Sequence, residues 1–343
     1  MGNIKRLLVA DDPSVPFVKR VKACPTASSF GIIIPKDGTK DSLLFLAPEA
    51  DAILCYKAEL SGSLIRAATS LRFVQKHGLN CNNIDVATAT ERNVLVATMP
   101  LMRNASVAEH ALAHMLACAR KIIPGHHAVV NATYQEMGLE PIQTSQWNFR
   151  KNWAGIEGVM ELFRAAVGII GMGDIGMEIA KRCRAFGMTV YYYDKIPHPS
   201  EVEIALGLQY LPFDKLLTVS DYVVLVVPHT PETEGLIGAK ELGLMKSSAT
   251  LINVGRGGLI DEVALVSALQ SKRLAMAGLD VYPMEPLPAS SPLRELPNVV
   301  LTPHTGGGSY RFMDADIDAS LQNIERFFRG EKPSGIINAP QSS

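Results

Sequence analysis

A glycine-rich turn between a strand and a helix constrains this chain more than any other feature of its sequence. The apolar run 165–170 leads into the six residues GMGDIG at 171–176, and a helical pattern follows over 175–186. Gly187 ends that pattern, and a second apolar run over 188–193 ends at Asp194. A G-x-G-x-x-G string that joins a strand to a helix, with an acidic residue about 20 positions later, predicts a Rossmann-type dinucleotide-binding unit.

Each residue type in this turn has a separate physical task. Gly171 permits the tight turn, Gly173 lets the backbone approach a pyrophosphate, and Gly176 lets helix and strand pack closely. Asp174 and Ile175 lie at the amino terminus of the expected helix, where N–H groups and the helix dipole attract phosphates. All five are therefore candidate cofactor-binding residues.

Asp194 is the candidate residue for choosing between the two nicotinamide cofactors. At the tip of the second strand, its carboxylate can accept hydrogen bonds from ribose hydroxyls, and its charge repels a 2′-phosphate. We therefore expect NAD (NADH) in preference to NADP. Lys195 beside it weakens this preference, so NADP stays the alternative.

Apolar runs alternate with longer helical patterns along most of the chain, which predicts an α/β fold built on parallel sheets. A chain of 343 residues exceeds what one core usually organises, so we expect two domains. Ser106 and Glu109 form a capping box that predicts a helix to Ile123, ended by Pro124-Gly125. Apolar runs in the first hundred residues lie at 6–10, 31–34, 52–55, 72–75 and 94–97, and a last helix is expected over 311–329.

The stretch 131–162 has no regular pattern and holds both tryptophans, Trp147 and Trp153. Two interpretations stay open. The stretch forms a lid or wall over the substrate, or it forms an arm packed in a subunit interface.

Charge and cysteine content exclude several classes of function. The chain has 33 Lys and Arg and 34 Asp and Glu. It therefore has no overall field to bind nucleic acid or an anionic membrane. Its five cysteines form no C-x-x-C pair, which argues against a disulfide framework and a structural zinc site, and we expect no metal. The first apolar run is too short for a signal peptide or a membrane span, so we expect a soluble, cytoplasmic protein.

Three ionisable residues, Arg256, Glu285 and His304, lie where later apolar runs end in glycine or proline. Their segments are NVGRGG at 253–258, DVYPMEP at 280–286 and LTPHTGG at 301–307. Strands of a doubly wound sheet present ligands at their carboxyl ends, so these side chains are expected at that edge.

The segment VPHTPET at 227–233 follows another apolar run. By the same rule, Pro228, Thr230 and Thr233 are candidates for the adenine side of the cofactor site. His229 has no partner that the sequence identifies.

These segments resemble the D-isomer-specific 2-hydroxyacid dehydrogenase family over residues 72–307. The resemblance is carried by GMGDIG, Asp194, VPHTPET, NVGRGGLIDE, AGLDVYPMEP and LTPHTGG, in that order. It implies an NAD-dependent oxidoreductase (EC 1.1.1.-) that interconverts a 2-oxo acid and a D-2-hydroxy acid by hydride transfer. It also implies that Arg256 binds and polarises the substrate, His304 is the acid/base and Glu285 is its partner.

The residue types fit that chemistry. A guanidinium can bind oxygens of both the carboxylate and the carbonyl of a 2-oxo acid while it stays charged. Hydride addition leaves negative charge on the carbonyl oxygen, which an imidazolium neutralises by donating a proton. The resemblance also implies that Asp280 lies near the nicotinamide, and Val254 and Asp280 complete the candidate cofactor-binding residues.

The resemblance also implies the architecture: two doubly wound parallel-sheet domains, one Rossmann-type and NAD-binding, the other smaller, flavodoxin-like and substrate-binding. We expect the NAD-binding domain over 106–303 and the substrate domain over 1–105 and 304–343. The family habit and the long expected helix suggest a homodimer.

The chain departs from the family pattern near its substrate-binding loop, HGLNCNNID at 77–85. Gly78 and Leu79 can still offer backbone N–H groups to a substrate carboxylate. Asn80 stands where a second glycine is usual and Cys81 where an aromatic residue is usual, so the substrate stays open. Arg103 replaces a common asparagine and adds a positive group.

Other functions on this fold are less consistent with the sequence. Formate dehydrogenases carry glutamine where Glu285 stands, and phosphite dehydrogenases carry lysine where Leu79 stands. A rival from another class is an NAD-sensing interaction protein of the corepressor type. The set Arg256, Glu285 and His304 favours the enzyme over that alternative.

Overall fold

The computed structural model describes residues 4–79, 81–307 and 310–339. It divides into two compact units, Met1–Asn104 with Ser309–Ser343, and Ala105–Gly308. The first junction lies beside the expected one. The second follows His304 instead of preceding it, so His304 belongs to the same unit as Arg256 and Glu285.

The first unit is built on a five-stranded sheet in the order β2-β1-β3-β4-β5, with every pair parallel. This is the flavodoxin-like order. The strands are β1 (Arg6–Val9), β2 (Gly31–Ile33), β3 (Ala52–Cys55), β4 (Phe73–His77) and β5 (Leu95–Met99). The helices are α1 (Pro16–Ala23), α2 (Lys40–Leu46), α3 (Gly62–Ala67), α4 (Val86–Glu91) and α12 (Tyr310–Phe328), with 3-10 turns at η1 (Pro25–Ser29) and η2 (Ala47–Glu49).

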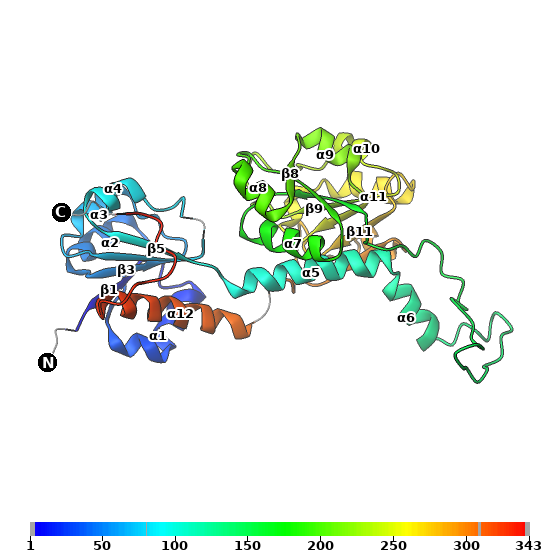
Figure 1. Cartoon of the computed structure of the whole chain (residues 1–343), viewed down its shortest axis with the longest axis horizontal. Helices are drawn as coiled ribbons and strands as arrows, with labels where there is room; N and C mark the ends of the chain where they lie inside the picture. Colours follow the sequence, from blue (N-terminus) through cyan, green and yellow to red (C-terminus); the bar gives the residue numbers. More distant parts are fainter. Residues whose placement is uncertain (1–3, 80, 308–309, 340–343) are drawn as a thin grey trace. The chain divides into compact units, whose positions relative to one another are not determined.

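Helices cover both faces of this sheet because its strands are apolar on both sides. Leu7 packs with Phe17 of α1 and Ile317 of α12, whereas its neighbour Leu8 packs with Leu43 of α2 on the opposite face. Successive strand residues point to opposite faces, which produces this division. Figure 1 shows α1 and α12 on one side of the sheet and α2, α3 and α4 on the other.

The second unit is built on a seven-stranded parallel sheet in the order β12-β11-β10-β9-β6-β7-β8. The Rossmann order is contained in it, with the reversal between β6 and β9. The strands are β6 (Ala166–Ile170), β7 (Thr189–Tyr193), β8 (Leu208–Tyr210), β9 (Tyr222–Leu225), β10 (Thr250–Asn253), β11 (Met276–Leu279) and β12 (Val299–Leu301). The helices are α5 (Met102–Ala119), which begins at the junction, α6 (Ile122–Val130), α7 (Asp174–Ala185), α8 (Ser200–Leu206), α9 (Phe213–Val219), α10 (Ala239–Leu244) and α11 (Glu262–Gln270), with η3 (Gly257–Leu259) and η4 (Pro292–Glu295).

The expected two parallel-sheet α/β domains are confirmed, but the expected start of the long helix is wrong. Helix α5 begins at Met102, so Ser106 lies inside the helix instead of capping it. The Met102 N–H donates to Asp316 Oδ1 of α12 at 2.9 Å. A carboxylate distant in sequence therefore supplies the amino-terminal cap that the local pattern assigned to Ser106.

The expected end of this helix also differs. The chain breaks at Lys121, whose φ is 53°, and α6 then continues through Pro124 and Gly125. Proline is tolerated here because it lies in the first turn of α6, where an N–H has no acceptor within the helix. Residues 131–165 follow as turns without a helix or strand before β6.

Among the described residues, none of the helices combines the length and the apolar character that a bilayer crossing needs.

Candidate active site

The glycine-rich turn joins β6 to α7, as the sequence predicts. Gly171 has a φ of 99°, and a Cβ there would lie 2.8 Å from Val227 Cγ1. A Cβ on Gly176 would lie 2.2 Å from the Gly171 carbonyl oxygen, so the packing of helix on strand excludes a side chain. A Cβ on Gly173 would meet no atom within 4 Å, so a ligand can approach the backbone there.

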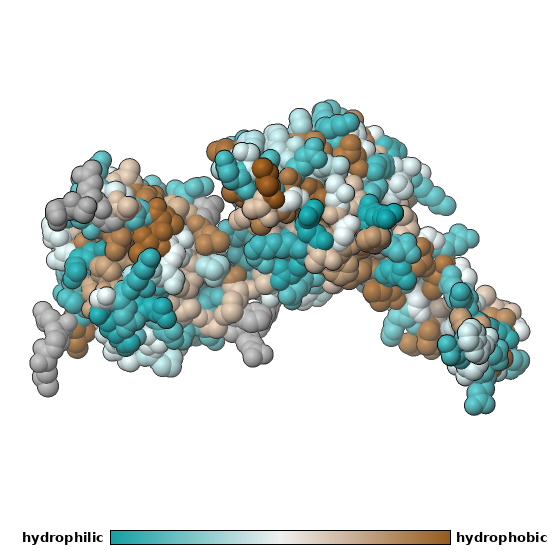
Figure 2. All heavy atoms as spheres, in the orientation of Figure 1, coloured by the Kyte–Doolittle hydropathy of each residue, from teal (hydrophilic) through white to brown (hydrophobic). Residues whose placement is uncertain are grey.

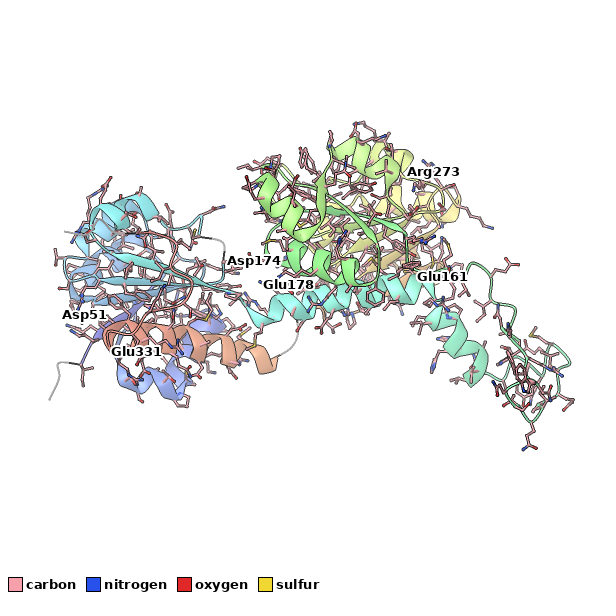
Figure 3. The ribbon with its side chains drawn as sticks, in the orientation of Figure 1. Asp51, Glu161, Asp174, Glu178, Arg273 and Glu331 are labelled. Atoms are coloured by element: carbon pink, nitrogen blue, oxygen red, sulfur yellow. The ribbon has the colours of Figure 1, made fainter. Side chains whose placement is uncertain are left out.

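The amino terminus of α7 directly follows this open side of the turn. Gly173 is the N-cap residue and brings no side-chain oxygen to the end of the helix, while Asp174 and Ile175 form the first turn. Figure 3 labels Asp174 at this end and Glu178 further along the helix. The helix dipole favours an anion at this position, which is where a pyrophosphate is expected.

Asp194 follows β7 and is bonded to the glycine-rich turn. Its Oδ2 accepts a hydrogen bond from the Met172 N–H at 2.7 Å, and its Oδ1 accepts one from the Lys195 N–H at 2.7 Å. Because a carboxylate has about four acceptor positions, these two bonds leave room for ribose hydroxyls.

His198 is a residue of this site that the sequence reasoning missed. Its ring Nε2 lies 2.7 Å from the Met172 carbonyl oxygen, and its backbone N–H donates to the Tyr192 hydroxyl at 2.8 Å. Asp194 therefore binds the N–H of Met172, and His198 binds its carbonyl oxygen. The loop after β7 thus fixes both backbone polar groups of this residue of the glycine-rich turn.

The loop after β9 is closed by its own side chains. Thr233 Oγ1 accepts from the Thr230 N–H at 2.8 Å and donates to the Pro228 carbonyl oxygen at 2.8 Å. His229, for which the sequence identified no partner, is hydrogen bonded to Glu234. The loop therefore has a fixed shape at the carboxyl end of β9.

Arg256 lies in a loop after β10 that the Asn253 side chain holds. Asn253 Nδ2 donates to the Arg256 carbonyl oxygen at 2.9 Å, and its Oδ1 accepts from the Gly255 N–H at 3.1 Å. Val254, the next residue after Asn253, is buried. The Arg256 side chain is exposed and donates to the Gly255 carbonyl oxygen at 2.6 Å. A Cβ on Gly257 would lie 1.9 Å from the carbonyl carbon of Tyr282, so this loop packs backbone to backbone against the loop after β11.

Glu285 and His304 meet, although they are 19 positions apart in sequence. Glu285 Oε2 lies 2.7 Å from His304 Nδ1, and Glu285 Oε1 accepts from the Tyr282 N–H at 3.1 Å. Burial raises the pKa of Glu285, but the hydrogen bonds from His304 and from the Tyr282 N–H lower it by more, so the carboxylate is ionised at neutral pH.

A cavity of about 480 Å³ lies beside this pair. Its size is within the range of small-molecule sites. The pair's own side chains stay partly accessible, at 35% for Glu285 and 43% for His304. The lining residues are Tyr282, Glu285, Pro286, Leu287, Leu301, Thr302, Pro303 and His304.

Asp280 is buried next to this segment and is bonded on every side. Its Oδ1 lies 3.0 Å from His110 Nε2 and accepts from the Thr302 hydroxyl at 2.6 Å. Oδ1 also accepts from the Thr305 N–H at 2.9 Å, and Oδ2 accepts from the Gly306 N–H at 2.8 Å. Burial raises the pKa of Asp280, but these hydrogen bonds together hold it far below its usual range. The ionised carboxylate therefore fixes the backbone that follows His304.

His114 joins the same network from α5. Its Nε2 and that of His110 each lie 2.9 Å from Thr302 Oγ1. Burial lowers the pKa of His114 to about 4, so the ring is neutral near pH 7. His110, His114 and Asp280 are residue types that bind metals, and one possible ligand atom of each lies within 4.8 Å of the others. The Thr302 hydroxyl, however, is hydrogen bonded to all three side chains. The arrangement is that of a polar network that orders the loop of His304.

Within the first unit, Gly78 follows β4 with a φ of 119°, a conformation that favours glycine. The Met99 N–H donates to its carbonyl oxygen at 3.1 Å. Leu79 follows it, and Asn80 lies outside the described residues. Asn83 Nδ2 donates to the Ala58 carbonyl oxygen at 2.6 Å, which ties this loop to the loop after β3.

Comparison with known proteins identifies relatives over most of the chain. Residues 112–306 match the model of the NAD-binding domain of D-isomer specific 2-hydroxyacid dehydrogenases. A glyoxylate reductase from Pyrococcus furiosus is 35% identical over 300 residues, which cover 87% of this chain and 85% of that protein. A D-3-phosphoglycerate dehydrogenase from Mycobacterium leprae is 39% identical over 303 residues, and the match spans about half of its length, 53%.

A solved structure has the same fold over nearly the whole chain. It is the NADPH-dependent glyoxylate/hydroxypyruvate reductase from Sinorhizobium meliloti. Its TM-score is 0.60 at 26% identity, and the match covers 98% of this chain and 97% of that one.

Proposed function

Because the chain belongs to the D-isomer specific 2-hydroxyacid dehydrogenase family, we propose that it uses NAD(H) to interconvert a small 2-oxo acid and its D-2-hydroxy acid. Family membership establishes the coarser activity, oxidoreduction of 2-hydroxy and 2-oxo acids with a nicotinamide dinucleotide. The observation that carries the finer proposal is the Glu285–His304 pair, with 2.7 Å between Oε2 and Nδ1, at the wall of a cavity.

The residues of the glycine-rich turn fit the cofactor. The backbone at Gly173 is open to a ligand, and α7 presents its amino terminus beside it. These groups would hold the pyrophosphate, with Pro228, Thr233 and Val254 along the rest of the cofactor. When bound, the reduced nicotinamide supplies the hydride.

His304 would move the proton. Because Nδ1 faces the Glu285 carboxylate, Nε2 is the ring nitrogen that can face a substrate. In the reducing direction, the imidazolium donates its Nε2 proton to the oxygen at C2 of the substrate. In the oxidising direction, the neutral ring accepts that proton, and Glu285 stabilises the charge that forms.

Arg256 would bind the substrate and polarise its carbonyl group. A planar guanidinium can donate to a carboxylate and to the adjacent carbonyl oxygen, and it remains charged at any working pH. Its exposed side chain extends from a loop that Asn253 holds in place. Gly78 and Leu79 of the first unit would add backbone donors for the substrate carboxylate.

We propose NAD rather than NADP as the physiological cofactor. Asp194 places a negative charge at the end of β7, where a 2′-phosphate would be repelled. The S. meliloti reductase is NADPH-dependent, so similarity to known proteins alone does not decide between the two cofactors. Asp194 is therefore the residue that supports the choice in this chain.

We also propose a homodimer in which α6 and residues 131–162 form an arm at the subunit interface. None of the residues of α6 is buried, although Ile122, Val129 and Val130 are large and apolar. Trp147 is 88% exposed in the segment that follows. Figure 2 shows apolar residues on the surface of this part of the unit, and a second copy would bury them.

The test of the proposed activity is consumption of NADH with a panel of 2-oxo acids. The expected result is turnover with at least one of them, a loss of about 100-fold or more in kcat for His304→Gln, and nearly unchanged NADH affinity. Arg256→Ala should lower kcat/KM severely, whereas the exposed Arg294→Ala serves as the matched control.

Absence of turnover with every 2-oxo acid, despite tight NADH binding, would contradict the proposal and favour a binding protein. Equal loss of NADH affinity and kcat in His304→Gln would make that residue structural.

A further inference from the structure

Three cationic side chains gather around one aromatic ring in the first unit. Lys57 Nζ lies 5.5 Å from the centre of the Tyr56 ring, Lys76 Nζ 5.8 Å and Arg103 Cζ 4.9 Å. Lys76 also donates to the Tyr56 carbonyl oxygen, and Arg103 donates to the Tyr56 hydroxyl. These four residues form what we call the cationic cluster.

The cationic cluster lies at the ligand edge of the sheet. Tyr56 and Lys57 directly follow β3, Lys76 is near the end of β4, and Arg103 follows β5 at the start of α5. Strand β4 is the neighbour of both β3 and β5, and Cys55 is in register with Lys76. Carboxyl ends of parallel strands are where ligands bind in such sheets.

Among the residues that the structure describes, no ion pair neutralises the charges of the cluster. Over the described ranges 4–79, 81–307 and 310–339, Lys57, Lys76 and Arg103 have no carboxylate oxygen within 4.0 Å. Lys76 is only 6% exposed. A lysine this buried without a paired charge is costly unless an anion compensates it.

Two carboxylates near the cluster, Asp11 and Asp316, accept backbone N–H groups. Asp11 accepts from the N–H groups of Tyr56 and Lys57, both at 2.6 Å, and from that of Ala58 at 3.1 Å. Asp316 accepts from the Met102 N–H, and its pKa is raised, mainly by burial. His77 is neutral at pH 7, because burial and then the charges of Arg103 and Lys76 lower its pKa to about 3.

The cluster adjoins the loop that is proposed to bind the substrate. A Cβ on Gly78 would lie 3.9 Å from Lys76 Cε. Gly78 and Leu79 are the proposed donors to the carboxylate at C1 of a 2-oxo acid. The cluster is therefore within reach of a substrate bound at this loop.

We propose that the substrate is a 2-oxo acid whose side chain carries a second anionic group, a carboxylate or a phosphate ester, bound by Lys57, Lys76 and Arg103. This inference rests on the proposed function, whose substrate class it narrows. An ammonium has three donors and a guanidinium five, so the bonds to Tyr56 leave donors for such an anion. All three cationic groups lie within 5.8 Å of the centre of the Tyr56 ring.

The test compares 2-oxo acids that carry a second anionic group with 2-oxo acids that lack one. Pyruvate and 2-oxobutanoate lack it, oxaloacetate adds a carboxylate, and 3-phosphooxy-2-oxopropanoate adds a phosphate ester. We expect kcat/KM for one of these two acids, called dianionic here because each carries two anionic groups, to exceed that for pyruvate by at least about tenfold. Whichever dianionic acid is preferred identifies the source of the anion.

Variants assign the preference to the cluster. Arg103→Gln and Lys57→Gln should each lower kcat/KM for the preferred dianionic acid about tenfold, chiefly through KM, while pyruvate changes less than about twofold. Arg326→Gln and Lys19→Gln, both on exposed parts of the same unit, are the matched controls. Lys57 is exposed, so its variant reports on binding even where a change at the more enclosed Arg103 disturbs folding.

Two outcomes would overturn the inference. Equal kcat/KM for pyruvate and both dianionic acids would remove the need for an anion site. Equal loss on all substrates in Arg103→Gln and Lys57→Gln, with unchanged thermal unfolding, would assign the cluster to the carboxylate that every 2-oxo acid shares. In both cases the proposed dehydrogenase activity would stand, whereas it fails only if none of the acids is reduced.

Discussion

Replacement of Glu285 by glutamine keeps the shape of the side chain but removes its charge. The amide oxygen can still accept from the Tyr282 N–H, which Glu285 now accepts at 3.1 Å, so the loop after β11 should keep its conformation. The position of Oε2, 2.7 Å from His304 Nδ1, then becomes an NH2 donor, which cannot accept from the imidazolium N–H, so the imidazolium is stabilised less. We expect slower turnover in a protein that folds normally.

The size of the effect follows from the exposure of the pair. A hydrogen bond to a charged group is worth about 1.5–3 kcal/mol. Because the side chains of His304 and Glu285 are 43% and 35% exposed, solvent screens their interaction, and about 1 kcal/mol is the more suitable figure. That corresponds to a loss of about fivefold in kcat if the imidazolium forms before or in the transition state.

The assay is steady-state reduction of the best 2-oxo acid at saturating NADH, together with urea unfolding. Glu295→Gln makes the same chemical change at an exposed position of the same unit and is the matched control. The free energy of unfolding should change by less than about 0.5 kcal/mol in both variants. A kcat of Glu285→Gln equal to that of Glu295→Gln would refute the role of the carboxylate.

Three further results are expected. Asp194→Ala should raise kcat/KM for NADPH relative to NADH by about tenfold or more, since it removes the charge that repels a 2′-phosphate, and an unchanged ratio would count against that role. Gly176→Ala should lower the free energy of unfolding by about 1–3 kcal/mol, because its Cβ would lie 2.2 Å from the Gly171 carbonyl oxygen, whereas Gly243→Ala in α10, with no atom within 4 Å, should be neutral or slightly stabilising. Because the pKa of Asp280 is lowered in the folded protein, its ionised carboxylate stabilises the fold fully at pH values above the pKa of an unfolded aspartate, about 3.9. This stabilisation decreases as the pH falls below that value. The difference in unfolding free energy between wild type and Asp280→Asn, measured in urea, should therefore be constant above about pH 5 and shrink on acidification, and a difference that grows would contradict this.

Features that depend on neighbouring residues were predictable from the sequence. The strand, turn and helix around Gly171 and Gly176 follow from local periodicity and from the absence of a side chain. The two parallel sheets were also predictable, because apolar runs alternate with helical patterns and parallel strands must be joined by crossover connections. Strand ends differ from the expected ones by a few residues at most, as for β4 at Phe73–His77.

Features that depend on distant contacts were not predictable. Helix α5 begins at Met102 because Asp316, from the other end of the chain, accepts its N–H. His198 lies in the loop after β7, and this position is the one sequence feature that could have pointed to the cofactor site. Its partner Met172 lies 26 positions earlier, so local sequence does not reveal the contact. A single histidine among prolines gives no periodicity to interpret.

The cationic cluster illustrates the same limit in the first unit. The sequence singled out Arg103 as an added positive group, but it gave no reason to connect it with Lys57 or Lys76. Those residues follow or end neighbouring strands, and the sheet order that brings them together depends on the whole fold. The motifs of the second unit therefore name its candidate residues, whereas the grouping of the cationic cluster in the first unit emerges only from the fold.

The most direct test of the proposed chemistry follows the hydride itself. The wild-type protein is incubated with NADH that carries deuterium at both hydrogen positions of nicotinamide C4 and with the preferred 2-oxo acid. The product is analysed by mass spectrometry and chiral chromatography. We expect one deuterium at C2 of a 2-hydroxy acid of D configuration, and at least about 100-fold less product with His304→Gln. Product of L configuration would contradict the proposed D specificity. Deuterium lost to solvent, or equal product from the variant, would contradict direct hydride transfer at a site where His304 supplies the proton.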